Sequence, residues 1–186
     1  MTACLLLSFG TLFAGCGGGS GGSDVIPGGG GGSSTFAPSF TPQQSNPQPD
    51  MVTMSSVVAL NGELTVAVNV TETDRIASAS LEITYNPAYL EFVDWSCGNL
   101  LPPCGSATLA LFDDSSPGRL IIGLARTNAG EGSDAYGTEV LLRMTFRALR
   151  TGASPLGFDT SRSALGDPDL NDIPGISWYG GTVVTN

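Results

Sequence analysis

Residues 63–70 read ELTVAVNV, and this stretch decides the fold class. Its largest apolar residues occupy alternate positions: Leu64, Val66, Val68 and Val70. A period of two is the pattern of a β-strand that buries one of its two faces. The alternation returns at residues 76–85 (IASASLEITY) and 138–148 (TEVLLRMTFRA). Half-buried strands of this kind predict antiparallel sheets.

Six shorter segments complete a series of strands along the rest of the chain. They are residues 51–60, 90–95, 107–112, 119–126, 155–158 and 177–185. Turn-forming pairs such as Asn61-Gly62 and Asn86-Pro87 separate neighbouring segments. Outside an amino-terminal apolar run, no stretch keeps a helical period over ten residues. About nine strands at regular spacing predict an all-β protein, a β-sandwich.

The amino terminus has the features of an export signal. Residues 3–13 (ACLLLSFGTLF) form an apolar run of 11 residues, whereas a membrane-spanning helix needs about 20. The next residues, Ala14-Gly15-Cys16, resemble a bacterial lipobox, in which a peptidase cuts before a cysteine that carries diacylglycerol. We expect a signal peptide at residues 1–15 and a lipid on Cys16, with an ordinary signal peptide and an incidental cysteine as the alternative.

A segment of low complexity follows the cysteine. Residues 17–34 are mostly Gly and Ser, and residues 35–50 are rich in Pro and Gln. Such a composition has too few apolar side chains to offset the entropy lost on ordering. The sequence predicts a disordered linker at residues 16–50, spanning roughly 30 to 35 Å, and one folded domain at residues 51–186.

The composition excludes several classes of function. Acidic residues outnumber basic ones by 17 to 7, the net charge is −10, and the chain has no His. A chain with so few cations would be repelled by nucleic acid. Without His, the chain lacks the commonest general base and metal ligand. Its paired carboxylates, Asp113-Asp114 and Glu131 with Asp134, fall in turn-like stretches, so we expect neither catalysis nor a cofactor.

Residues 81–92 (LEITYNPAYLEF) resemble the cohesin family, in which a strand ends in a Tyr-Asp/Asn-Pro turn and the next strand begins Leu-Glu-Phe. Later segments continue the likeness in the family's order and spacing: GRLIIGLAR at 118–126, LLRMTFRA at 141–148, TGASPLGF at 151–158 and GGTVV at 180–184. The resemblance covers about residues 52–184. It implies a nine-stranded jelly-roll β-sandwich that docks a calcium-binding protein module, the dockerin, through one sheet face, in assemblies that degrade polysaccharides.

Cys97 and Cys104 lie seven residues apart in a Gly/Pro-rich loop (CGNLLPPC). In an exported chain this spacing favours a disulfide, because a metal site needs more ligands and a reactive pair needs a CxxC spacing. The bridge would fasten the loop and stabilise the fold by about 2 to 3 kcal/mol.

Residues 167–172 (DPDLND) place Asp167, Asp169 and Asn171 at the alternate spacing that opens an EF-hand calcium loop. The rest of that motif is missing, because the sixth position is not Gly and the twelfth is not Glu. A solvated acidic turn is the simpler interpretation, and calcium binding is the alternative.

Residues 138–148 also suggest a partner surface. Alternation predicts an inward apolar set of Val140, Leu142, Met144 and Phe146. The outward set is then Glu139, Leu141, Arg143, Thr145 and Arg147. Leu141 between Arg143 and Arg147 would give an apolar anchor rimmed by Arg, which protein interfaces favour. An isolated exposed leucine is also normal on a protein surface.

Exposed aromatic rings would instead indicate a sugar-binding platform. The candidates are Trp95, Trp178, Tyr179, Tyr89 and Tyr136. Core packing is simpler for Trp95 and for one of the neighbours Trp178 and Tyr179, because adjacent strand residues face opposite sides. Tyr136, in a Gly/Ser/Asp loop, is the best exposed candidate.

Together these features predict a secreted, lipid-anchored, non-catalytic recognition module of the bacterial cell envelope. Its expected partner is a dockerin-like protein module. Direct carbohydrate binding and a structural or adhesive envelope lipoprotein are the alternatives. Membrane contact is expected through the lipid anchor only.

Overall fold

The alternating segments form strands in the computed structural model, which describes residues 36–128 and 130–186. The strands are β1 Pro38–Pro42, β2 Met51–Leu60, β3 Glu63–Thr71, β4 Ser78–Tyr85, β5 Leu90–Cys97, β6 Thr108–Asp113, β7 Arg119–Arg126, β8 Thr138–Ala148, β9 Gly152–Phe158, β10 Ala164–Gly166, β11 Ser177–Tyr179 and β12 Gly181–Thr185. All nine predicted strands are present, the last of them divided into β11 and β12. β1 and β10 are additional.

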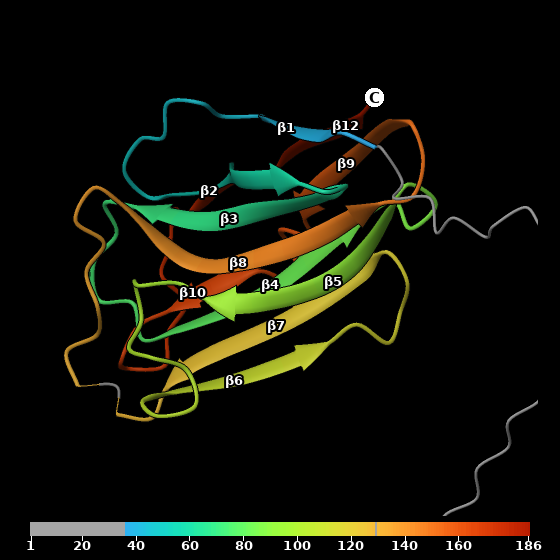
Figure 1. The fold of residues 1–186 in the computed structure, drawn as a ribbon. Helices are drawn as coiled ribbons and strands as arrows, with labels where there is room; N and C mark the ends of the chain where they lie inside the picture. Colours follow the sequence, from blue (N-terminus) through green and yellow to red (C-terminus); the bar gives the residue numbers. More distant parts are fainter. Residues whose placement is uncertain (1–35, 129) are drawn as a thin grey trace, which may run out of the picture. The chain divides into compact units, whose positions relative to one another are not determined.

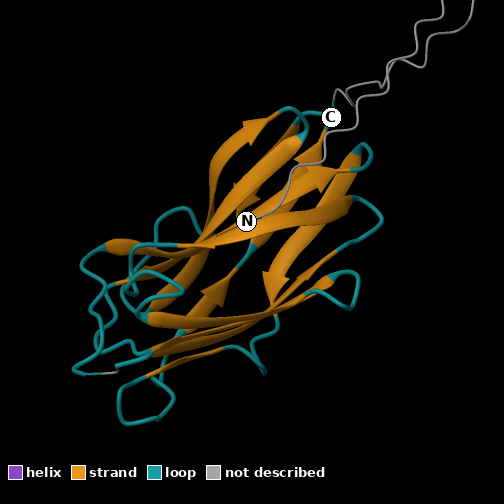
Figure 2. Cartoon of the chain, turned by 60° about the horizontal axis from the view of Figure 1, so that its bottom comes forward, coloured by secondary structure: helices purple, strands orange, loops and turns teal. Residues whose placement is uncertain are grey.

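The strands make two sheets that face each other as a sandwich (Figures 1 and 2). One sheet has seven strands, in the order β1-β12-β9-β4-β7-β6, with β10 also paired to β4. The other has five, in the order β11-β2-β3-β8-β5. The predicted all-β sandwich is confirmed. The described residues contain no helix, and so none there is long and apolar enough to cross a membrane.

The inward faces of both sheets supply one hydrophobic core. The five-stranded sheet contributes Leu64, Val66, Val68 and Val70 of β3, and the seven-stranded sheet contributes Leu81 and Ile83 of β4 with Leu120, Ile122 and Leu124 of β7. Each such side chain stabilises the fold by about 1.5 to 3 kcal/mol when fully buried. The core therefore uses one face of each strand and leaves the other face for surface roles.

The turn between β2 and β3 is the hairpin that Asn61-Gly62 predicts. Both residues have positive φ, 54° at Asn61 and 81° at Gly62. A two-residue hairpin of this type requires that conformation at both positions, and Asn-Gly adopts it readily. The turn sets Leu60 opposite Glu63 and fixes the register of the two strands.

β1 shows that the folded part begins earlier than predicted. We predicted a disordered linker through residue 50, but Pro38–Pro42 pair with Gly181–Thr185 of β12, and Phe40 packs against the core. Composition misses this strand because its prolines are typical of linkers, although proline is tolerated in an edge strand. The predicted signal peptide, Cys16 and the linker up to residue 35 lie outside the described residues.

The predicted strand at 177–185 is divided because the chain crosses between sheets. β11 runs parallel to β2 in one sheet, and β12 pairs with β9 in the other. Gly180 stands at the crossing, where a Cβ would collide with the carbonyl oxygen of Leu156. Only glycine lets the two backbones approach so closely.

A β-bulge reverses the predicted facing of two residues in β8. The pairing passes from Val68 opposite Leu142 to Asn69 opposite Val140, so that Leu141 is an inserted residue. Leu141 is 1% exposed and belongs to the core, whereas Val140 is only half-buried. The prediction that Leu141 faces solvent and Val140 the core is therefore wrong, because strict alternation does not anticipate an inserted residue.

Candidate partner-binding surface

β6 is an edge strand of the seven-stranded sheet (Figure 1). It carries exposed apolar side chains on the outer face of that sheet. Leu109 and Leu111 are 56% and 65% exposed. They alternate with Thr108, which is buried, and with Ala110 and Phe112, which pack against the core. One exposed leucine needs no explanation, but two on the same strand face form an apolar patch.

Strand register surrounds these leucines with small residues. Leu109 lies opposite Ala125 of β7, and Leu111 lies opposite Gly123. Gly123 in turn lies opposite Ser80 of β4. The outward side chains of β4, β6 and β7 in this region are named the β6–β7 face: Ser78, Ser80, Leu109, Leu111, Asp113, Ile121, Gly123 and Ala125. This face is a sheet surface with a shallow depression beside Leu111.

An ionic cluster borders the β6–β7 face. Glu82 of β4 is nearly buried, and Arg119 of β7 meets its carboxylate side-on, with Nε and Nη2 each 2.7 Å from one of its oxygens. Arg162 Nη1 lies 3.5 Å from Glu82 Oε2. The hydrogen bond from Arg119 lowers the pKa of Glu82, although desolvation opposes the shift. Glu82 is therefore a fixed anion at neutral pH and is unsuited to act as a general acid.

The outer face of the five-stranded sheet is polar over its central strands, β3 and β8. The hydroxyl oxygens of Thr65 and Thr145 lie 3.0 Å apart across β3 and β8. Arg147 donates to Glu63 at 2.8 Å and to Glu91 at 3.0 Å. These groups satisfy one another over β3, β8 and β5, and the exposed apolar side chains of this sheet, among them Val58 and Leu60, lie on β2.

The structure does not bring together the residues that the sequence proposed as a partner surface. Leu141 lies in the core, Arg143 is half-buried on β8, and Arg147 is engaged in its two ion pairs. Tyr136 is 82% exposed in the loop before β8. Its hydroxyl donates to Asp134 Oδ2 at 3.2 Å, and this hydrogen bond raises the pKa of Tyr136.

The aromatic residues do not form an exposed row. Trp95 stacks on Phe112 with ring centroids 5.7 Å apart, and both side chains pack against the core. Trp178 packs edge-on against Phe158 in the same way. Among the described residues, Tyr136 is the only largely exposed aromatic. A sugar-binding platform of several rings is therefore not supported.

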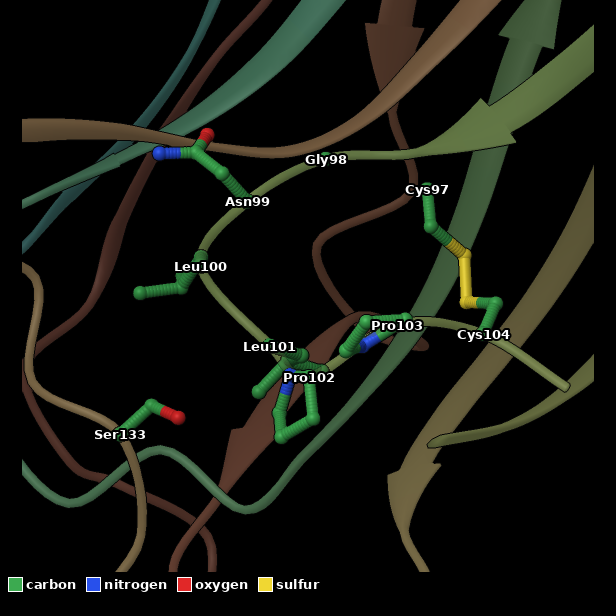
Figure 3. A pocket seen from close by; sticks show the side chains of 9 residues that line it. All are labelled: Cys97, Gly98, Asn99, Leu100, Leu101, Pro102, Pro103, Cys104 and Ser133. Carbon is green, nitrogen blue, oxygen red and sulfur yellow. A yellow bond between two sulfur atoms is a disulfide. The ribbon is translucent and has the colours of Figure 1, made fainter. Parts of the chain in front are cut away.

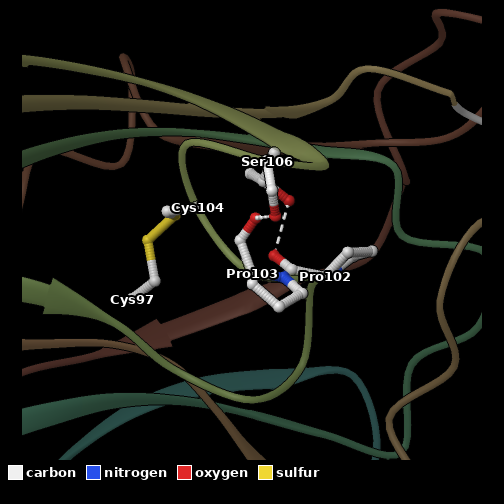
Figure 4. The surroundings of a disulfide bond; sticks show 6 residues. Cys97, Pro102, Pro103, Cys104 and Ser106 are labelled. Atoms are coloured by element: carbon white, nitrogen blue, oxygen red, sulfur yellow. Dashed lines mark hydrogen bonds between the residues drawn. A yellow bond between two sulfur atoms is a disulfide. The ribbon is translucent and has the colours of Figure 1, made fainter.

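The predicted disulfide joins Cys97 at the end of β5 to Cys104, with the two Cα atoms 6.2 Å apart (Figure 4). The loop between the two cysteines buries Leu100 and Leu101 (Figure 3). Thr108 Oγ1 donates to the carbonyl of Pro102 at 2.7 Å and holds the other side of the loop. A hollow beside this loop is lined by apolar and amide side chains, Ser133 and the bridged cysteines, without a titratable group. The bridge is confirmed, and the loop has a structural role.

The acidic turn at residues 167–172 is held by hydrogen bonds within the turn and by an ion pair with an arginine. Asp167 Oδ1 accepts the backbone N–H groups of Asp169 and Asn171, each at 2.9 Å, and the bond from Asn171 is the main cause that lowers the pKa of Asp167. Asp169 pairs with Arg75 at 2.8 Å. In the part of the chain that the structure describes, no group of three or more His, Cys, Asp or Glu residues could hold a metal ion. These contacts favour the acidic turn over a calcium loop.

Asp113 and Asp134, from the two carboxylate pairs considered as catalytic candidates, likewise accept hydrogen bonds from backbone N–H groups of loops. Asp113 Oδ1 accepts the backbone N–H of Ser115 at 2.9 Å, which lowers the pKa of Asp113. Asp134 Oδ1 accepts the backbone N–H of Arg75 at 2.8 Å. A catalytic acid needs a raised pKa and a partner across a cleft. The pKa of Asp113 is shifted the other way, and Asp134 is engaged by a backbone N–H group of a neighbouring loop.

Sequence reasoning missed Leu109 and Leu111. Residues 109–112 read LALF, four apolar residues in succession, and such a run does not show which pair faces outward. The packing of Phe112 decides the question, because its ring stacks on Phe92 with centroids 5.0 Å apart. Phe112 therefore faces inward, and the leucines face solvent.

The structure thus combines a β-sandwich, a sheet face with exposed leucines, and carboxylates that bind turns or arginines. The family model described as "Cohesin domain" matches residues 52–184. The chain belongs to the cohesin domain family. No curated protein matches it.

Solved structures agree on the fold. A type II cohesin domain from the cellulosome of Acetivibrio cellulolyticus is 18% identical, with a TM-score of 0.53 over 81% of this chain and 94% of that one. A non-cellulosomal cohesin from the archaeon Archaeoglobus fulgidus is 21% identical, with a TM-score of 0.51 over 64% and 78%. A type II cohesin–X-dockerin complex from Acetivibrio cellulolyticus is 15% identical, with a TM-score of 0.55 over 76% and 93%.

Proposed function

We propose that this chain is a non-catalytic module of the cell surface that binds dockerin-type protein modules through the β6–β7 face. The observation that carries the proposal is the exposure of Leu109 and Leu111 side by side on β6. Support for the kind of partner comes from the similar cohesins, which include one in complex with an X-dockerin and one in complex with a Cel5 dockerin.

The β6–β7 face has the composition of a protein interface. Leu111 supplies an apolar anchor, and Gly123 and Ser80 beside it leave room for close approach by a partner. Glu82 and Arg119 supply fixed charges at the border, where complementary charges orient a partner and select against wrong ones. The partner should therefore present an apolar surface with polar groups around it.

Cys16 would hold the module at the membrane. A diacylglycerol on its thiol would anchor the mature chain, because each buried CH₂ contributes about 0.8 kcal/mol. Labelled fatty acid should be incorporated into the wild-type chain and absent from Cys16→Ser. Equal incorporation in both chains, or none in either, would remove the anchor from the proposal.

Calorimetric titration with calcium-loaded dockerin modules tests the binding surface. Leu111→Asp should weaken binding at least about 30-fold, since burying an unpaired charge at an interface centre costs about 2 kcal/mol or more. Leu170→Asp is the matched control, because Leu170 is a leucine that is 93% exposed in the acidic turn, outside the residues of the β6–β7 face. Arg143→Ala tests the opposite sheet and should leave affinity unchanged. Loss of binding in Arg143→Ala with full binding in Leu111→Asp would overturn the assignment of the face.

A further inference from the structure

The two ends of the sandwich differ in chemistry. The described chain begins at Phe36, which lines a hollow together with Leu60 and Asn61 of the β2–β3 hairpin. Ala37 donates its N–H to the carbonyl of Asn186 at 3.3 Å, so that the carboxyl terminus lies at the same place. The preceding 35 residues, including Cys16, are therefore connected to the domain at this end.

Backbone hydrogen bonds join the other loops of this end to the hairpin or to one another. Ala148 donates to the carbonyl of Gly62, and Leu149 donates to that of Tyr89, both at 2.9 Å. Tyr85 donates to the carbonyl of Gly118 at 3.0 Å. These loops are named the stalk end: Phe36, residues 60–62, 86–89, 114–118 and 149–151, and Asn186.

Apolar side chains protrude from the turns of the stalk end. Leu60 is 66% exposed in the hairpin, and Leu149 is 44% exposed after β8. Val57 and Val58 continue the exposed apolar stretch along β2 from Leu60. Next to Leu149, the Arg150 guanidinium lies 4.2 Å from the ring centroid of Tyr89. Exposed leucines at this end, with an aromatic ring and an arginine beside one of them, are suited to a lipid interface.

The opposite end of the sandwich is strongly acidic. Its loops carry Asp50, Glu72, Asp74, Glu131, Asp134, Asp167, Asp169 and Asp172, and they are named the acidic end. Arg75 connects several of these loops, because its side chain pairs with Asp169 and its backbone N–H donates to Asp134. The stalk end is less acidic, because Arg119 pairs with Glu82, Arg147 pairs with Glu63 and Glu91, and Arg150 lies nearby, against the further carboxylates Asp113 and Asp114. An anionic lipid surface would therefore repel the acidic end more strongly than the stalk end.

We infer that the stalk end rests on the lipid surface to which the chain is anchored, with Leu60 and Leu149 in the interface. This inference rests on the proposed anchor at Cys16 and goes beyond it, since the sequence predicted membrane contact through the lipid alone. By their Gly/Ser-rich composition, residues 17–35 would give a tether of about 25 Å on average, which would keep the domain at high local concentration near the surface. Weak insertion of a few side chains is then enough to orient it.

This orientation keeps the β6–β7 face accessible. The strands run between the two ends, so that a sheet face stands beside the stalk end and not beneath it (Figure 1). A partner could therefore dock on β6 and β7 while the stalk end contacts lipid. The acidic end would point away from the membrane.

Quenching by nitroxide lipids tests the contact on the full chain. The thiol of Cys16 is coupled to a maleimide lipid in phosphatidylcholine vesicles that contain 5-doxyl phosphatidylcholine, in a Cys4→Ser background. Coupling makes the test independent of natural lipidation, so that failure of the anchor and failure of the contact are distinguishable. Leu60→Trp places a reporter at the stalk end, and Leu170→Trp is the matched control at the acidic end. Trp95 and Trp178 give the common background.

Leu60→Trp should be quenched at least about twofold more than Leu170→Trp, with a blue-shifted emission, because only its indole enters the interface. Adding Leu149→Asp should remove this excess while the chain stays coupled. Equal quenching of the two reporters would overturn the inference, as would stronger quenching of Leu170→Trp. An emission shift of Leu60→Trp only after a protein partner is added would also overturn it and would assign the stalk end to that partner.

Discussion

Leu141 is the inserted residue of the β-bulge in β8. The bulge opposite Val68 and Asn69 turns its side chain into the core, where it is almost fully buried. Leu141→Ala should lower the free energy of unfolding by about 2 to 4 kcal/mol, because it removes buried methyl groups and leaves a cavity. Urea denaturation measures this change. Leu109→Ala is the matched control on an exposed leucine and should stay within about 0.5 kcal/mol of wild type. Equal effects of the two substitutions would contradict the bulge.

Glu82 gives the fold a dependence on acid pH. Its pKa is lowered in the folded state, mainly by the hydrogen bond from Arg119. A lowered folded pKa stabilises the protein above the unfolded pKa, and that stabilisation is lost as the pH falls through the folded pKa. Unfolding at pH 7 and pH 3 should show that Glu82→Gln is less stable than wild type at pH 7 and that the gap narrows at pH 3. Glu131→Gln, on an exposed loop, is the matched control and should stay close to wild type at pH 7. A gap for Glu82→Gln that is as large at pH 3 as at pH 7 would contradict the ion pair.

At the level of residues, the sequence predicts features that depend on one segment of the chain. It misses the facing of side chains where that facing depends on the contact between two strands. Cys97 and Cys104 were predicted from spacing and compartment, because a short loop restricts their partners. Leu141 was misplaced because a bulge arises only when β8 meets β3. The exposure of Leu109 and Leu111 was missed because it depends on which way Phe112 faces. Phe112 faces inward because its ring stacks on Phe92 of β5.

Among the elements, β1 has a role that its composition does not suggest. It covers the edge of β12 and carries Phe40 against the core. The chain 51–186 should therefore be less stable than the chain 36–186 by about 2 to 3 kcal/mol, the contribution of a large buried side chain. It should also self-associate through the open edge of β12. Denaturation and light scattering measure the two effects, and Phe40→Ala in the longer chain separates core packing from edge protection. Equal stability of the two chains would show that β1 is dispensable.

The remaining elements follow well from the alternation, since each strand buries one face against a single core. All nine predicted strands occur, and Asn61-Gly62 forms the predicted hairpin. The two exceptions depend on the sandwich as a whole. Gly180 lets the last strand change sheets, and Pro38–Pro42 becomes a strand only because the edge of β12 is available.

For the whole molecule, the two outer sheet faces have different uses. The five-stranded sheet satisfies its polar groups internally, as Arg147 does with Glu63 and Glu91. The β6–β7 face leaves Leu109 and Leu111 exposed. With the stalk end toward the lipid and the acidic end away from it, a partner would approach from the side.

Methyl NMR of the chain 36–186, titrated with a calcium-loaded dockerin module, tests the central claim most directly. The account predicts that the methyl resonances of Leu109, Leu111 and Ile121 shift or broaden on binding, because the partner covers them. The methyl groups of Val57, Val58 and Thr65, which lie on the other sheet, should keep their positions. Perturbation confined to the five-stranded sheet, or no perturbation with any dockerin module, would contradict binding through the β6–β7 face.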